Sequence, residues 1–266
     1  MELSAELPTK LAPELVIAQF SDSHLFADIN GLHYGANVYQ NLVKVLTAIV
    51  QDKSVDIVVF TGDLTQDHSE QSYLNFVQAI NRTGISTPIY FLAGNHDEFY
   101  LLNKYLTNSP FNSQKFIENE HWQIALLNTK SATPAGVVSE QSLQELSQHL
   151  DQTKKQLLFT HHHPIDVNYF IDKHGLTNKP ALWQTLAQYP SISAIACGHV
   201  HRALELVQRV NNRKIIVLTC PATSIQFDPQ ADTVKALAIT VGQGIGYRQL
   251  NLYEDGSLST QIVFVK

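Results

Sequence analysis

The apolar segment Ile89–Leu92 runs directly into the polar sequence Ala93–Asp97, which contains Gly94 and Asn95. A short apolar run closed by a Gly-Asn turn is typical of a buried strand. The polar side chains that follow such a strand project from the carboxyl end of a sheet, where open α/β sheets bind ligands. This segment therefore predicts an α/β fold whose functional residues follow its strands.

Four other apolar segments end in Asp or His residues. They are Val16–Phe20 before Asp22 and His24, Ile57–Phe60 before Asp63, Gln156–Thr160 before His161, His162 and His163, and Ile195–Cys197 before His199 and His201. Because the carboxyl ends of parallel strands meet at one edge of a sheet, we expect these side chains to converge. With Asn95 they form an oxygen and nitrogen ligand set that suits a divalent transition metal better than Mg²⁺ or Ca²⁺. The sequence therefore predicts a dinuclear metal site.

Length and charge restrict the class of protein. The 266 residues suit one large α/β domain covering residues 1–266, and no segment resembles a linker. A net charge of −6 offers no basic surface for nucleic acid or an anionic membrane. No apolar run approaches the roughly 18 residues of a membrane span, and Met1–Pro13 lacks the pattern of a secretory signal. We therefore expect a soluble, cytoplasmic protein with no nucleic-acid, membrane or protein partner implied.

The two cysteines, Cys197 and Cys220, each end an apolar run. A redox pair or a metal ligand is one interpretation. In a chain without export signals, buried reduced thiols are the favoured one.

Apolar residues between the strands recur at helical spacing, which predicts crossover helices. The expected helices are Asn37–Lys53, a segment after Glu70 with Leu74, Val77 and Ile80 on its buried face, a segment from Asp97 to about Leu106, a segment capped by Ser139 with Leu143, Leu146 and Leu150 apolar, and Pro180–Gln188. The segment Pro164–Lys179 is too long for an ordinary connection and indicates a lid or binding loop.

The remaining segments alternate as strands do. They are Lys115–Ile117, Trp122–Leu127, and beyond His201 the antiparallel runs Ala203–Val210, Lys214–Thr219, Lys235–Val241, Tyr247–Tyr253 and Ser259–Val265, with turn signals at Asn211–Asn212 and Asp255–Gly256. We expect a mixed α/β half and a β-rich C-terminal half. Together they predict a four-layer α/β/β/α sandwich of two mixed β-sheets flanked by helices.

Five short motifs occur in a recognisable order. They are Asp22-x-His24, Gly62-Asp63, Gly94-Asn95-His96-Asp97, His162-x-Pro164 and Gly198-His199-x-His201. This series resembles the signature blocks of the calcineurin-like metallophosphoesterases, which have the metallo-dependent phosphatase fold. Within that superfamily the chain is similar to the bacterial class III 3′,5′-cyclic AMP phosphodiesterases, through Asp22–Ala27, the three histidines before Pro164, Cys197–His201 and Pro221–Phe227. It departs from the pattern at Ile245–Arg248 and in the loop Asp166–Lys173.

The resemblance implies two divalent metal ions, with Fe²⁺ or Mn²⁺ favoured. It assigns Asp22, His24, Asp63 and His201 to the first metal, and Asp63, Asn95, His162 and His199 to the second, with Asp63 bridging. Substrate would contact His24, Asp63, Asn95, His96 and His201.

The implied reaction converts 3′,5′-cyclic AMP to 5′-AMP and lowers cellular cyclic AMP. A metal-bound hydroxide would attack phosphorus, because two metals can supply both a nucleophile and positive charge. His96 would protonate the 3′ leaving oxygen, with Asp97 orienting its ring.

Two alternatives remain. One is a broader phosphodiesterase or phosphomonoesterase with the same metals, acting on glycerophosphodiesters or other nucleotides. The other is a metal-binding scaffold without chemistry, which the intact motif set disfavours.

Several histidines and neighbours keep an alternative role. We expect His161 and His163 to support or pack beside the site, and His33, His68, His121 and His149 to lie on the surface. His174, Gln226 and Phe227 fit either a nucleoside contact or ordinary loop and core positions.

Overall fold

Two six-stranded sheets form the centre of the molecule. The computed structural model describes residues 12–233 and 244–266. The first sheet has the order β14-β13-β1-β4-β5-β6, with β1 Leu15–Phe20, β4 Ile57–Phe60, β5 Ile89–Phe91, β6 Phe111–Asn112, β13 Gly246–Leu252 and β14 Leu258–Phe264. The second has the order β11-β12-β10-β9-β8-β7, with β7 Phe116–Glu118, β8 Trp122–Leu126, β9 Lys155–Thr160, β10 Ile192–Cys197, β11 Glu205–Val210 and β12 Arg213–Thr219. A small hairpin pairs β2 (Leu32–His33) with β3 (Ala36–Asn37).

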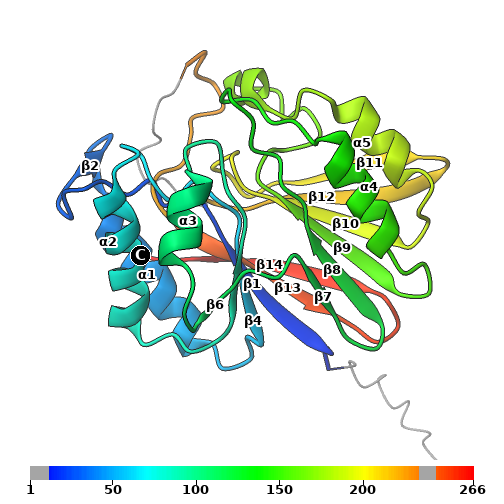
Figure 1. Ribbon diagram of the computed structural model, residues 1–266, viewed down its shortest axis with the longest axis horizontal. Coiled ribbons are helices and arrows are strands. Elements are labelled where there is room, and N and C mark those ends of the chain that lie inside the picture. Colours follow the sequence, from blue (N-terminus) through cyan, green and yellow to red (C-terminus); the bar gives the residue numbers. More distant parts are fainter. Residues whose placement is uncertain (1–11, 234–243) are drawn as a thin grey trace, which may run out of the picture.

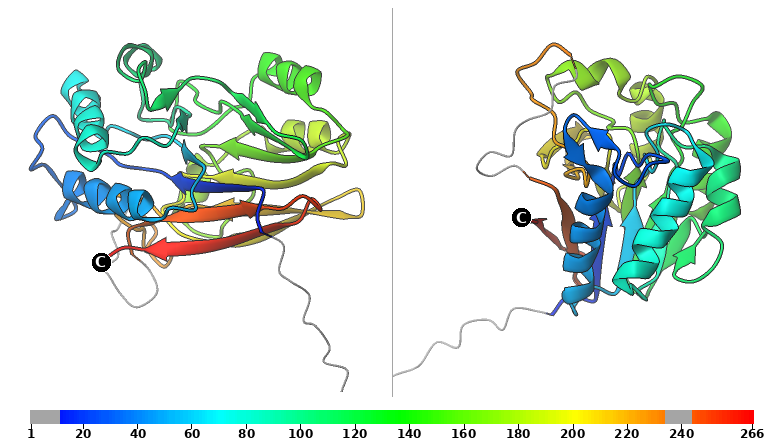
Figure 2. Two further views of the ribbon diagram at one scale, coloured as in Figure 1. Left: turned by 90° about the horizontal axis from the view of Figure 1, so that it is seen from below. Right: turned by 90° about the vertical axis from the view of Figure 1, so that its left-hand side faces the viewer.

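Helices cover the outer faces of both sheets (Figure 1). The first sheet packs against α1 Val38–Gln51, α2 Glu70–Thr83 and α3 Phe99–Tyr105, and the second against α4 Glu140–His149 and α5 Lys179–Leu186. In the left view of Figure 2, α1 and α2 lie on the opposite side from α4 and α5. The predicted four-layer sandwich is confirmed.

The central strands are apolar throughout because both of their faces are buried. In β4, Ile57 and Val59 belong to the cluster between the two sheets, whereas Val58 and Phe60 belong to the cluster under the helices. Burying each such side chain stabilises the fold by about 1.5–3 kcal/mol. The apolar runs in the sequence therefore reflect a three-layered core.

The predicted division into an α/β half and a β-rich C-terminal half was wrong. β13 pairs antiparallel with β1 in the first sheet, while β12 pairs parallel with β10 in the second. The C-terminal strands are thus shared between the sheets, because each sheet has an edge whose backbone groups they satisfy. The strand predicted at Lys235–Val241 lies outside the described residues.

The buried face of α2 also differs from the prediction. Tyr73, Phe76 and Ile80 are buried, whereas Leu74 is 41% exposed. The hydroxyl oxygen of Tyr73 accepts a hydrogen bond from the backbone N–H of Glu98, at the start of α3. Tyr73 and Phe76 therefore occupy core positions on this helix in place of Leu74, whereas Ile80 is buried as predicted.

Arg248 ties the two sheets together. It lies on β13, is fully buried, and donates to the carbonyl oxygens of Thr219 and Leu204 at 2.9–3.1 Å and to the hydroxyl of Thr260 at 2.8 Å. The segment Ile245–Arg248, in which the chain departs from the family pattern, therefore bears on sheet packing.

Cys197 and Cys220 are buried free thiols, as predicted. Burial raises the pKa of both thiols. The thiol of Cys220 donates to the carbonyl oxygen of Gln19, so both cysteines act as small core residues. Within residues 12–233 and 244–266, no helix has the length and apolarity needed to cross a membrane.

Candidate metal centre

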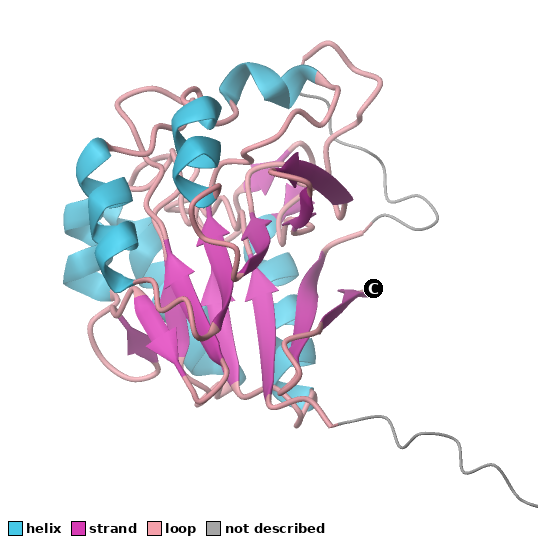
Figure 3. Cartoon of the chain, turned by 90° about the vertical axis from the view of Figure 1, so that its right-hand side faces the viewer, coloured by secondary structure: helices cyan, strands magenta, loops and turns pink. Residues whose placement is uncertain are grey.

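The predicted ligands follow strands that are neighbours in the two sheets. β1, β4 and β5 are adjacent and parallel in the first sheet, and β9 and β10 are adjacent and parallel in the second. Several strand arrowheads point toward one end of the molecule in Figure 3. The turns that carry the Asp, Asn and His residues meet there, between the sheets.

Left-handed backbone conformations are concentrated in these turns. The φ angle is 57° at Asp22, 46° at His24, 57° at Asp63, 65° at His199 and 52° at His201. Such conformations cost roughly 1–3 kcal/mol at non-glycine residues and persist only where the surroundings hold them. The surrounding structure therefore holds these turns in strained backbone conformations, and the conformations set the directions of the Asp and His side chains.

The turns after β4 and β5 are pressed together. Gly62 has φ 98°, and a Cβ there would lie 2.3 Å from the backbone nitrogen of Gly94. The carboxylate of Asp97 accepts hydrogen bonds from the N–H groups of Asp63, Leu64 and Gly94 at 2.8–2.9 Å. The predicted contact of Asp97 with the His96 ring was wrong, because both carboxylate oxygens hold backbone amides instead.

The first donor cluster joins Asp22, His24 and His201. The Nδ1–H groups of His24 and His201 donate to the side-chain oxygen of Gln66 (2.7 Å) and the carbonyl oxygen of Ile225 (2.8 Å). Their Nε2 lone pairs then face each other at 3.1 Å, with Asp22 Oδ1 4.0 and 3.4 Å away. Burial lowers the pKa of His24 well below its ordinary value, so the His24 ring is neutral.

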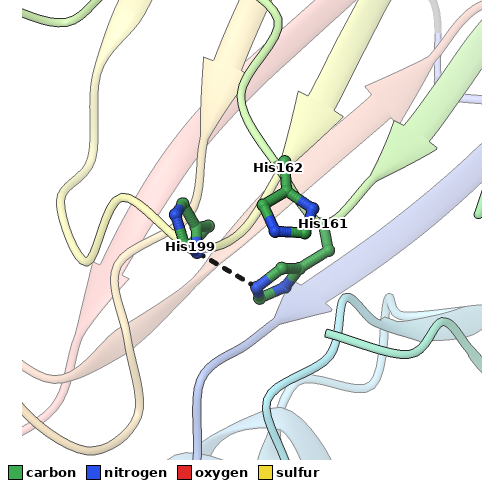
Figure 4. A group of neighbouring side chains, drawn as sticks. All are labelled: His161, His162 and His199. Atoms are coloured by element: carbon green, nitrogen blue, oxygen red, sulfur yellow. Dashed lines mark hydrogen bonds between the residues drawn. The ribbon is translucent and has the colours of Figure 1, made fainter. Parts of the chain in front are cut away.

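The second donor cluster centres on His161. Its Nδ1–H donates to the carbonyl oxygen of Thr61 at 2.7 Å, which directs Nε2 inward. Nε2 lies 3.1 Å from Asn95 Oδ1, 3.3 Å from Asp63 Oδ2 and 3.2 Å from His199 Nδ1. Figure 4 shows the approach of His161 to His199. Burial alone lowers the pKa of His161, but the Asp63 carboxylate raises it to about 9, so a cation entering here would displace a proton.

Asp63 is common to both clusters. Its Oδ2 lies 3.6 Å from His24 Nε2 and 3.3 Å from His161 Nε2, and its Oδ1 accepts from the backbone N–H of His96 at 2.8 Å. Burial by itself raises the pKa of Asp63, but the histidines around it, led by His161, hold that pKa well below the usual range. An ionised carboxylate oxygen thus lies between two groups of imidazole nitrogens.

The donor sets fit divalent cations. Ligand atoms of Asp22, His24 and His201, and those of Asp22, Asp63 and His161, lie within 4.8 Å of one another and are buried. Lone pairs that converge in this way repel unless positive charge lies among them. The outer ring nitrogens donate to oxygens of the surrounding protein, as in metal-ligating histidines.

The three consecutive histidines have three different environments. His162 comes within 4.8 Å of His161 and His199, but both of its ring nitrogens already have partners. The hydroxyl of Thr129 donates to Nδ1 at 2.8 Å, and Nε2 faces the carbonyl oxygen of Pro134 at 3.1 Å. The structure therefore brings His161, and not His162, against Asp63 and Asn95.

His163 supports the neighbouring loop. Its Nε2 donates to Asp172 at 3.1 Å, and its ring stacks on that of His199 with centroids 5.6 Å apart. The expectation of a packing role for His163 agrees with these contacts.

His96 lies beside the first cluster. Its ring meets that of His24 edge-on at 4.9 Å, and its buried Nδ1 has no partner within the described chain. Burial lowers the pKa of His96. The ring is therefore a neutral group with one free nitrogen next to the donor atoms.

Two histidines near His96 were expected on the surface. His68 is exposed, but its ring stacks on that of His96 at 5.6 Å with 9° between the planes. His33 is half-buried, 5.3 Å from the ring of His24, so its surface prediction was wrong. The β2–β3 hairpin turns His33 back toward the site, and no periodicity in the sequence indicates this.

Two cavities open beside the donors. One of about 200 Å³ is bounded by the donor residues and by Phe170, Ile171, His174 and Phe227. The other, of about 440 Å³, is bounded by polar residues that include His68 and Lys130. Asn95, His96 and Pro134 line both, so the cavities meet at the donor clusters.

A sandwich of two mixed sheets flanked by helices is the metallophosphatase fold. In fold the chain is similar to a dimetal phosphatase from Danio rerio (TM-score 0.65, 14% identity, covering 96% of this chain and 100% of that one). It is also similar to the purple acid phosphatase PPD1 of yellow lupin (TM-score 0.62, 15% identity, 93% of this chain and 51% of that one).

Residues 15–203 match the model of the calcineurin-like phosphoesterase family, and the chain belongs to this family. It is 53% identical over 254 residues to a probable cyclic nucleotide phosphodiesterase of Colwellia psychrerythraea, covering 94% of this chain and 95% of the relative. It is 33% identical to the 3′,5′-cyclic adenosine monophosphate phosphodiesterase CpdA of Escherichia coli K12, covering 98% and 94%. The resemblance inferred from the motifs is confirmed, and the protein is a phosphoester hydrolase.

Proposed function

We propose that the protein hydrolyses 3′,5′-cyclic AMP to 5′-AMP with two divalent metal ions and so lowers cellular cyclic AMP. The observation that carries this proposal is the pair of buried donor clusters joined by Asp63, with His96 at their edge and a cavity of about 200 Å³ in front. The names of the relatives in Colwellia and Escherichia coli support a cyclic nucleotide as the substrate.

The proposed ligands differ from the sequence assignment at one position. Asp22, His24, Asp63 and His201 would hold the first ion, and Asp63, Asn95, His161 and His199 would hold the second. His161 replaces His162 because the ring nitrogens of His162 are already engaged. Fe²⁺ and Mn²⁺ suit this oxygen and nitrogen set.

When bound, the two ions would activate a water molecule and cover the charge of the phosphate. The chain itself orients the substrate and moves a proton. His24, Asp63, Asn95, His96 and His201 surround the cavity in which the phosphate would lie. The phosphodiester anion beside His96 favours the protonated ring, which donates its proton to the 3′ oxygen as the P–O bond breaks.

We propose that this reaction takes place in the cytoplasm, in a single domain of residues 1–266 with no nucleic-acid, membrane or protein partner. The buried free thiols suit a reducing compartment. A net charge of −6 disfavours polyanionic partners.

Substrate choice is tested with the Mn²⁺-reconstituted protein on 3′,5′-cyclic AMP, 3′,5′-cyclic GMP, 2′,3′-cyclic AMP and bis-(p-nitrophenyl) phosphate. We expect the highest kcat/KM for 3′,5′-cyclic AMP, with 5′-AMP as its product by chromatography. If the protein cleaves only the activated diester, the assignment of cyclic AMP as substrate is refuted and only the metal-dependent phosphodiesterase chemistry is supported.

The cavity of about 440 Å³ beside His96 favours a second candidate function, that of a broader phosphodiesterase, because this cavity leaves room for a larger leaving group.

The assignment of the second metal is tested by a matched pair of variants. His161→Ala should reduce metal content from two ions toward one, because it removes the lone pair that faces Asp63 and Asn95. Removing even an indirect partner of a ligand costs about 10–100-fold in affinity or activity, so we expect a larger loss. His162→Ala should keep both ions. Metal analysis of the purified, reconstituted variants decides the matter, and the reverse pattern would restore His162 as the ligand.

A further inference from the structure

The segment between β9 and α5 forms one wall of the smaller cavity. It contains a short 3-10 helix, η1 (Phe170–His174), within the stretch that the sequence marked as a lid or binding loop. Phe170, Ile171 and His174 line the cavity together with the donor residues. The wall that faces the proposed phosphate position is therefore largely apolar.

This wall is an apolar cluster separate from the three layers of the core. Phe170, Ile171, Ile225 and Phe227 are each less than 9% exposed and pack with one another. The Phe170 and Phe227 rings meet at 5.2 Å and 62°. Phe227 also stacks on His201 at 3.9 Å and 7°, so the aromatic surface begins one ring away from the first donor cluster.

The wall is anchored to the turns that carry the donors. The carboxylate of Asp172 on η1 accepts from Val167 N and Asn168 N at 2.8 Å and from His163 Nε2 at 3.1 Å. The hydroxyl of Tyr169 donates to the carbonyl oxygen of Val200, between His199 and His201. The distance from wall to donors is thus set by the same turns that hold the donors.

His174 is a polar group without a protein partner. It is half-buried, lines the cavity, and forms no hydrogen bond with any residue that the structure describes. Every other side of the cavity offers donor residues or apolar surface. Its ring nitrogens are therefore available to a ligand.

We infer that η1 and Phe227 form the pocket for the heterocyclic base of a nucleoside phosphate, with His174 hydrogen-bonding the edge of the base. The inference rests on the proposed function only in taking the phosphate to lie at the donor clusters. A ligand with its anionic group there must direct its remainder at the apolar wall, and a planar base gains from an aromatic surface that a glycerol group does not use. This selects nucleoside phosphates over glycerophosphodiesters.

The test compares two ligands by calorimetry on the Mn²⁺-loaded protein: 5′-AMP, and ribose 5-phosphate, which lacks the base. Stacking of a base on an aromatic side chain predicts that 5′-AMP binds about 5- to 150-fold more tightly. Phe170→Ala should remove most of this difference and leave ribose 5-phosphate binding unchanged. Phe170→Leu keeps apolar bulk without the ring face and should recover only part of it. His174→Ala should weaken 5′-AMP alone, with recovery in His174→Gln.

Phe264→Ala serves as the control, because Phe264 is 39% exposed on β14 and lines neither cavity. Equal affinity of the two ligands for the unmodified protein would overturn the inference, as would an equal loss for both in Phe170→Ala. A preference for 5′-AMP that depends on Phe170, in a protein that does not hydrolyse cyclic AMP, would support the base pocket and refute the proposed reaction.

Discussion

Replacing Asp63 by asparagine is expected to remove both metal ions and the activity together. Asp63 Oδ2 lies 3.6 Å from Nε2 of His24 and 3.3 Å from Nε2 of His161, and so faces both donor clusters. The amide is neutral, so the clusters lose the negative charge that offsets two cations in a buried site. We expect metal affinity to fall by more than about 100-fold, because indirect partners alone cost about 10–100-fold.

Metal content by mass spectrometry and kcat/KM on cyclic AMP measure this effect. Asp255→Asn makes the same chemical change in the exposed turn between β13 and β14 and should alter neither quantity. An Asp63→Asn protein that keeps two ions per chain would contradict the bridging role.

Replacing His96 by alanine is expected to lower kcat on cyclic AMP by about 10²–10⁴-fold, the usual contribution of a general acid. Both metal ions should remain, because the Nδ1 of His96 is unpartnered and its backbone N–H, which holds Asp63, is unchanged. The loss should be much smaller on bis-(p-nitrophenyl) phosphate, since a nitrophenolate departs without a proton.

The comparison of the two substrates separates an acid from a structural residue. An equal loss on both substrates, or loss of metal, would make His96 a supporting residue. His149→Ala is the control, because His149 is an exposed histidine at the end of α4 that stacks on Phe116, away from both cavities.

The ends of the strands could be predicted because buried strands are runs of apolar residues in the sequence. A strand covered on both faces must be apolar, as Val58 and Val59 are, so a polar residue that follows it marks the edge of the sheet. Asp22, Asp63, Asn95 and His199 were found in this way, and the structure brings all four beside the donor clusters. The pattern could not say which strands are neighbours, which is why β13 was assigned to a separate half.

The direction in which each side chain points within a turn could not be predicted from the sequence. His161, His162 and His163 are chemically identical, and their roles differ because Thr61, Thr129 and Asp172 come from other segments to hold each ring. The same holds for Asp97, whose acceptors are taken by the amides of the neighbouring turn.

The sequence by itself determined the sandwich architecture, the family and the set of side chains available for chemistry, because these follow from the alternation of apolar runs with Asp, Asn and His. Only the tertiary structure decided which histidine faces Asp63, how His33 returns to the site and how η1 closes the cavity. Those choices depend on hydrogen bonds and packing between segments up to about two hundred residues apart, such as Asp22 with His199 and Ser224. Such contacts cannot be predicted from the sequence around each residue.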